Sequence, residues 1–300
     1  MNAKILDVLT AKFGEDIIKI LLDDGKIEIS KFNESPVSFI NARDKKIQSF
    51  LDEGIINKDT HEKIINNVPD NWGFDFPGWL GQLDAGKKIM IIGQEPNVQN
   101  PPVQIVYGFN QNANESSNNA AQRLFEAGKS AEDKNEKKGH LKLWHRIAEL
   151  FEGHFGSKIE VLENCYITDI CHFAPSRCGT VKKINSIFGS DNSQKWEEIR
   201  FQILSNYLER EIDALSPEII ICQSDITYKT ILKILNPTPV SETQMMYPKN
   251  GYKIKFSTWR NKVNLIGVPH MGSNFNITDK FWKHHLYAVK ELINSQLKIQ

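Results

Sequence analysis

The sequence lacks the patterns that mark several large classes of protein. Neither of the glycine-rich phosphate-binding patterns GxxxxGK[ST] and GxGxxG occurs in its 300 residues, which disfavours the nucleotide-binding folds built on such loops. No apolar run approaches the length of a membrane span, and acidic residues follow closely on the first apolar ones where a signal peptide would have its apolar core. We therefore expect a cytoplasmic protein without a membrane partner.

Cysteine is scarce, and no CxxC pair occurs. In a reducing compartment such cysteines are free thiols by default, and we expect no metal and no cofactor. The four are Cys165, Cys171, Cys178 and Cys222.

An excess of charge is also lacking, since the 37 basic residues balance the 37 acidic ones. The balance hides an asymmetry, because eleven basic residues face three acidic ones after Ile226. Such a tail suits a polyanionic partner, although a solvated lysine-rich face would give the same pattern.

Apolar runs of strand length alternate with segments of helical period from about residue 85 onward. This alternation predicts an α/β fold with three αβα layers and a central, mainly parallel four-stranded sheet. Residues 1–70 have helical periodicity and predict an N-terminal helical extension to an α/β domain over residues 71–300. The aromatic stretch 72–83 is interpreted as a cover over the core. The expected strands are 88–92, 165–168, 219–222 and 263–268, and the expected helices are 120–127, 141–151, 194–215 and 279–297.

Two turns at strand ends carry groups suited to catalysis. Glu95 lies in Gly93-Gln94-Glu95-Pro96-Asn97 after the first predicted strand, and His270 lies in Pro269-His270-Met271-Gly272-Ser273 after the last. Because the carboxyl ends of parallel strands converge on one crevice, an acid and an imidazole are expected to face it together. This combination suggests hydrolysis.

Four stretches in this order carry a family resemblance. Gly93 to Asn97 resembles the Gly-Gln-Asp-Pro-Tyr motif of uracil-DNA glycosylases, and the His270 loop resembles their His-Pro-Ser-Pro loop. Residues 165–169 with Pro175 resemble the strand that ends in the base-reading Asn, and residues 207–221 resemble the helix and strand before the last motif. The likeness covers about residues 85–295 and leaves the N-terminal extension unexplained.

The resemblance implies roles for both turns. Cleaving a base from deoxyribose leaves positive charge on the sugar and negative charge on the base, so groups of opposite character are needed on the two sides. Glu95, in place of the family's Asp, would position or deprotonate the water. His270 would donate a hydrogen bond to O2 of the departing base.

The resemblance also implies contacts with a flipped nucleotide, because the target bond is inaccessible inside a duplex. Gly93 and Gln94 would lie at the substrate, and Phe109 would stack on the base. In the loop Met271-Gly272-Ser273-Asn274-Phe275, either Met271 or Phe275 would be the apolar wedge in the minor groove. Lys280 and Lys283 of the basic tail would contact phosphates.

Two departures from the family bear on the base. Asn97 replaces the Tyr that excludes a substituent at C5. Asp169 stands where the family has Asn, and an ionised Asp only accepts hydrogen bonds, as the amino group of cytosine requires. This points to a C5-modified cytosine, such as those of some viral DNA. The rival base-reading residue is Asn164 in Leu162-Glu163-Asn164. If Asn164 reads the base, uracil becomes the expected substrate.

The sequence thus predicts a monofunctional, metal-free DNA glycosylase that uses water as nucleophile, acts on DNA and is a monomer. One branch of the family holds an iron–sulfur cluster with two cysteines upstream of the first motif, whereas every cysteine here lies downstream of it. The alternative is an inactive DNA- or nucleotide-binding protein on the same fold.

Overall fold

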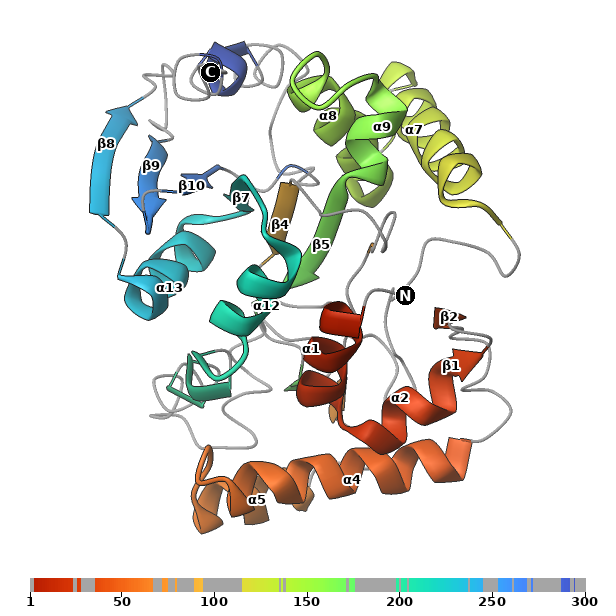
Figure 1. The fold of residues 1–300 in the computed structure, drawn as a ribbon, viewed down its shortest axis with the longest axis vertical. Helices are drawn as coiled ribbons and strands as arrows, with labels where there is room; N and C mark the ends of the chain where they lie inside the picture. The colour runs from red at the N-terminus through yellow and green to blue at the C-terminus, as the bar shows by residue number, and fades with distance from the viewer. Residues whose placement is uncertain are drawn as a thin grey trace.

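The computed structural model has an α/β architecture, shown in Figure 1. It describes residues 3–23, 26–27, 36–66, 72–74, 79, 89–93, 115–134, 136, 139–170, 173–175, 198–199, 201–203, 205–236, 238–244, 253–260, 262–268, 271, 287–291 and 294. Within these ranges, no helix combines the length and the apolar character needed to cross a membrane.

A six-stranded sheet forms the centre, in the order β5-β4-β7-β10-β9-β8. The strands β5, β4, β7 and β10 are mutually parallel, whereas β9 and β8 continue the sheet in antiparallel pairing. Four strands were predicted, so the parallel part agrees with the sequence and the antiparallel pair corrects it. The bounds are β4 Ile89–Gly93, β5 Cys165–Asp169, β7 Ile219–Cys222, β10 Val263–Gly267, β9 Lys253–Trp259 and β8 Thr238–Gln244.

The reason for the difference lies in the side-chain patterns. Strand β4 is buried at all five positions and β7 at all four, so each appears in the sequence as a continuous apolar run. Strand β8 is Thr-Pro-Val-Ser-Glu-Thr-Gln, a polar sequence that pairs through its backbone at the edge of the sheet.

Helices pack on one face of the sheet in what we call the α7-side core. Helices α7 (Ser117–Asp133), α8 (Gly139–Phe151) and α9 (Lys158–Glu163) lie together in Figure 1. They bury Leu124, Trp144 and Val161 against strand residues such as Ile91 and Ile221. A capping box at Ser157 and Glu160 begins α9.

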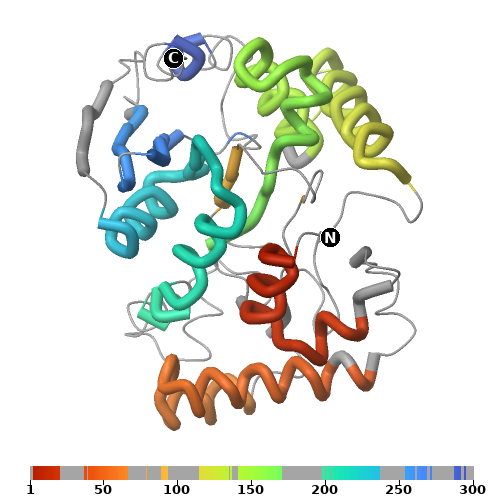
Figure 2. Tube along the Cα trace, in the orientation of Figure 1, coloured from red at the N-terminus to blue at the C-terminus, as the bar shows by residue number. Residues whose placement is uncertain are grey.

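The opposite face is covered by what we call the α1-side core. Its helices are α1 (Ala3–Phe13), α2 (Glu15–Leu21), α4 (Pro36–Asp52), α5 (Lys58–Ile65), α12 (Leu208–Leu215) and α13 (Asp225–Leu235). Leu9 and Phe13 belong to the same buried cluster as Met90 and Ile92 of β4. The N-terminal helices, which Figure 2 shows side by side at one end of the molecule, therefore contribute to the core against the sheet. The boundary at residue 70 stays a prediction.

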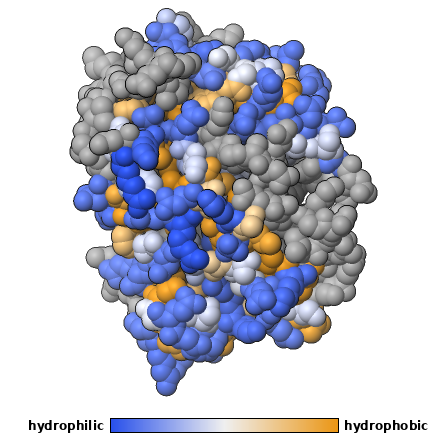
Figure 3. All heavy atoms as spheres, viewed as in Figure 1, coloured by the Kyte–Doolittle hydropathy of each residue, from blue (hydrophilic) through white to orange (hydrophobic). Residues whose placement is uncertain are grey.

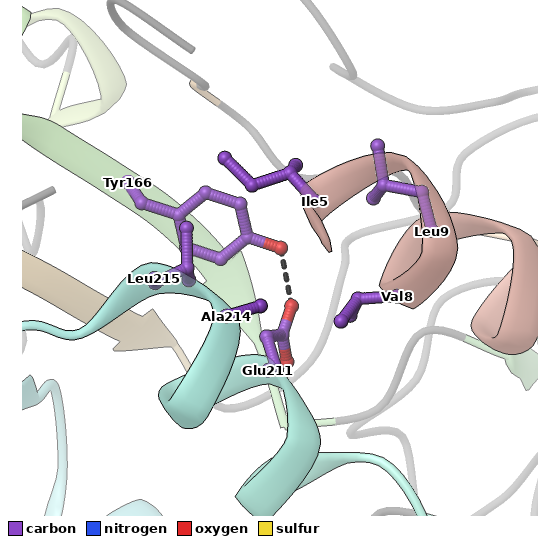
Figure 4. A pocket seen from close by; sticks show the side chains of 7 residues that line it. All are labelled: Ile5, Val8, Leu9, Tyr166, Glu211, Ala214 and Leu215. Carbon is purple, nitrogen blue, oxygen red and sulfur yellow. Dashed lines mark hydrogen bonds between the residues drawn. The ribbon is translucent and has the colours of Figure 1, made fainter. Parts of the chain in front are cut away.

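A buried ion pair links α1 to α12 on this face of the sheet. Lys12 Nζ lies 2.8 Å from Glu211 Oε1 of α12, and both side chains are almost completely buried. The hydroxyl of Tyr166 on β5 donates to the same carboxylate oxygen, beside a small pocket lined mainly by apolar residues of α1 and α12 (Figure 4). Burial, and then the Glu211 charge, raise the pKa of Tyr166 well above its usual value, so the phenol stays a donor.

Short strands complete the description. Strand β3 (Trp72–Phe74) pairs antiparallel with β6 (Phe173–Pro175), and β1 (Leu22–Asp23) pairs with β2 (Lys26–Ile27). Trp79 bridges to Ile167, is 1% exposed, and donates from its indole nitrogen to Leu162 O at 2.7 Å. Trp79 thus acts as the predicted cover. On the face in Figure 3, hydrophilic residues occupy most of the described surface.

Candidate functional site

The carboxyl ends of the parallel strands place four residues in a row across the sheet. Gly93 of β4 pairs with Asp169 of β5. On the other side of β4, the backbone N–H of Gln223 donates to Ile92 O at 2.9 Å, which sets Gln223 level with Gly93. The N–H of Val268 donates to Cys222 O at 3.0 Å and brings Val268 level with Gln223.

This row lies on the face of the α7-side core. Ile167, Ile91, Ile221 and Ile266 each precede one member of the row by two residues, and all four belong to that core. Because side chains alternate between the faces of a strand, positions two residues apart share a face. We call Asp169, Gly93, Gln223 and Val268 the strand-end row.

Asp169 and Gly93 are in contact. A Cβ added to Gly93 would lie 1.9 Å from Asp169 Oδ1, so the carboxylate occupies the space that any other residue at position 93 would fill. Asp169 is partly exposed, whereas Gly93 is buried. Position 93 therefore requires a glycine for a steric reason, and the Asp169 carboxylate lies directly above it.

Gln223 has an unusual environment within the row. Its side chain is 2% exposed, and its Oε1 accepts no hydrogen bond from any residue that the structure describes. Buried polar atoms in proteins are nearly always hydrogen-bonded, so an unpaired buried acceptor is a candidate for a ligand contact. Sequence reasoning missed Gln223, although it follows an apolar strand in the same way as the Glu95 and His270 turns follow theirs.

Arg146 of α8 holds the chain next to His270. Its Nη1 donates to Met271 O at 2.6 Å, while Nε and Nη2 each lie 3.0 Å from the Glu132 carboxylate of α7. Only 3% of the Arg146 side chain is exposed. A bidentate salt bridge with a carboxylate fixes the plane of the guanidinium group, and the guanidinium in turn fixes the position of the Met271 carbonyl. No sequence signal distinguishes Arg146 from a surface arginine.

Asn164 lies at the other end of β5. It is the C-cap of α9, its amide nitrogen donates to Glu160 O at 2.9 Å, and its backbone carbonyl accepts from Ile89 N. Asp169 follows it by five positions along the strand, a distance of about 16 Å. Asn164 thus lies at the amino end of the parallel strands and Asp169 at the carboxyl end.

Of the residues that the sequence predicts in the His270 loop, the structure describes only Met271, and it also describes Cys222 at the end of β7. Met271 is 1% exposed and packs in the α7-side core. Cys222, at the end of β7, has its pKa raised by burial, which keeps the thiol neutral and a poor nucleophile. The other predicted residues lie outside the described residues: Gln94, Glu95, Asn97, Phe109, His270, Gly272, Ser273, Asn274, Phe275, Lys280 and Lys283.

Comparison with known proteins agrees with this layout. A model of the Uracil DNA glycosylase superfamily matches residues 80–271, which include all four parallel strands as well as Glu95 and His270. No curated protein sequence matches the chain. The match extends over more than half of the 300 residues, from just before the first parallel strand to the loop after the last one. The chain therefore belongs to the uracil DNA glycosylase superfamily.

Proposed function

We propose that the protein is a monofunctional DNA base glycosylase that hydrolyses the N-glycosidic bond of a flipped pyrimidine. The observation that carries the proposal is the contact of Asp169 with Gly93 at the carboxyl end of the sheet, inside the matched family region. It supports a base-reading carboxylate beside the turn that contains Glu95. Ligands of open α/β sheets bind at this edge.

The proposed chemistry divides between the two turns. Glu95 follows Gly93 by two residues and would orient or deprotonate the attacking water on the sugar side. His270 lies between Val268 and Met271, both buried in the α7-side core, and would donate to O2 of the departing base as negative charge develops there. The hydrogen bond from Arg146 to Met271 O supports a fixed backbone beside His270.

Asp169 is proposed to read the base. An ionised carboxylate accepts from the exocyclic amine of a cytosine, while Asn97 leaves room beside C5, so a C5-modified cytosine is favoured over uracil. The position of Asn164 at the amino end of β5 supports Asp169 as the reader. A biological role in DNA repair or in defence against modified viral DNA is consistent with either base.

DNA is proposed to approach from the loop that follows His270. Because Met271 is buried, Phe275 is the better candidate for the apolar wedge. Phe109 would stack on the flipped base, with Gln94 nearby, and Lys280 and Lys283 would neutralise phosphates.

The deciding experiment is a panel of oligonucleotides, each with one uracil, thymine, cytosine or 5-methylcytosine, assayed for abasic sites. We expect base release by the wild type and a decrease of at least about a hundredfold in Glu95→Gln, with little change in DNA affinity. Asp169→Asn should shift the preference toward uracil by about ten- to a hundredfold, whereas Asn164→Ala should leave it unchanged.

The alternative function is DNA binding without catalysis, which the replacement of the family's Asp by Glu95 favours. Tight DNA binding by the wild type, without abasic sites on any member of the panel, would establish that alternative. A shift of base preference in Asn164→Ala and none in Asp169→Asn would assign the reader to Asn164.

A further inference from the structure

We infer that Gln223 is a second base-reading residue, and that its Oε1 and the Asp169 carboxylate together accept the two N–H groups of one exocyclic amine. This inference rests on the proposed function and specifies the substrate class, a pyrimidine with an amino group at C4. It concerns a residue outside both sequence motifs and is carried by the strand register, the burial of Gln223 and its unpaired acceptor.

The register places the two acceptors on either side of Gly93. Adjacent strands lie about 4.8 Å apart, so Gln223 and Asp169 begin about one strand spacing from Gly93 on opposite sides. Asp169 reaches back over Gly93, where its Oδ1 would lie 1.9 Å from an added Cβ. Gln223 has the longer side chain and shares the same face of the sheet. The register therefore starts the two acceptor side chains on either side of Gly93, at the carboxyl end of the parallel strands.

The chemistry of the pair selects a donor. An exocyclic amine has two N–H groups, one directed toward the pairing edge of the base and one toward C5. Two acceptors can satisfy both groups together, whereas the O4 of uracil has no hydrogen to give. If uracil were bound, the carboxylate oxygen and O4 would face each other as two acceptors, and neither would receive a hydrogen bond. The two acceptors therefore disfavour uracil.

When no base is bound, the unpaired Oε1 of Gln223 should lower the stability of the folded protein, and this effect can be measured independently of catalysis. A buried acceptor without a donor destabilises the folded state, and an apolar side chain of the same shape removes that penalty. Gln223→Met keeps the length of the side chain and deletes its polar end. A residue retained for stability would show a lower melting temperature on this change, whereas we expect an unchanged or higher one.

The experiment compares the wild type, Gln223→Met and Gln223→Asn on matched oligonucleotides with uracil or 5-methylcytosine. Base-release rates are measured at saturating enzyme, and affinities are measured by fluorescence polarisation in a Glu95→Gln background. We expect the preference for 5-methylcytosine over uracil to decrease by about ten- to a hundredfold in both variants. Gln122→Met is the matched control, because Gln122 lies exposed on α7 and bonds to Glu126.

The outcomes separate this inference from the proposed function. Base release by the wild type with an unchanged preference in Gln223→Met overturns the role of Gln223 and leaves the glycosylase proposal intact. Release of uracil alone by the wild type also overturns it. If no base is released, the glycosylase proposal fails, and the affinities decide: equal binding of both oligonucleotides by all variants overturns the role of Gln223. A loss of activity that only follows a lower melting temperature assigns Gln223 to stability.

Discussion

Substitution of Gly93 by Ala tests the site without removing any of its functional groups. A Cβ at this position would lie 1.9 Å from Asp169 Oδ1 and 3.2 Å from its Cγ, whereas real Cβ atoms essentially never come closer than 3.0 Å to a neighbour. The carboxylate oxygen must therefore move by about 1 Å, and a displacement of that size in a catalytic site can lower the rate by about a hundredfold.

The expected result for Gly93→Ala is a decrease of about a hundredfold in base release, together with a weaker preference between bases. Crowding of this kind also destabilises a packed region by about 1–3 kcal/mol, so the melting temperature should decrease. The assay is single-turnover base release at a temperature where circular dichroism shows every variant to be folded.

Gly54→Ala controls for the loss of stability. Gly54 has a φ of 70°, which is strained for any residue with a side chain, and nothing lies within 4 Å of an added Cβ. It lies just after α4, far in the sequence from the strand-end row. Wild-type rate and selectivity in Gly93→Ala would refute the placement of Asp169 as the base reader.

Four further predictions address the rest of the molecule. Charge reversal of Lys280 and Lys283 should flatten the slope of log affinity for DNA against log salt, and affinity insensitive to salt in the wild type would argue against a DNA track there. Arg146→Met should lower the free energy of unfolding in urea by about 1–3 kcal/mol, because Met271 O loses its buried donor; an unchanged midpoint would contradict this. Burial lowers the pKa of His145 below its usual 6.5, so the unfolded chain binds a proton that the folded chain excludes. Stability should therefore decrease as the pH falls below about 6.5, and His145→Gln should weaken this dependence; equal pH profiles would refute it. Anaerobically purified protein should be colourless and contain no iron, and a broad visible absorption would disprove this.

The sequence predicts a strand reliably where both faces of the strand are buried. Ile89 to Ile92 and Ile219 to Cys222 are apolar without interruption, which is a local property that a reader of the sequence can see. Elements α13, β8 and β9 are absent from the expected helices and strands, because they are partly polar. Strand β8 is stabilised by backbone pairing with residues nine to twenty positions away in β9.

The sequence by itself determined the class of fold and the family resemblance, because each depends on residues adjacent in the chain. Only the tertiary structure decided which side chains meet. The contact of Asp169 with Gly93 and the hydrogen bond from Arg146 to Met271 O join residues far apart in sequence, and the burial of Gln223 depends on such packing. Such contacts follow from the register of neighbouring strands and the packing of helices on them, which no local pattern encodes.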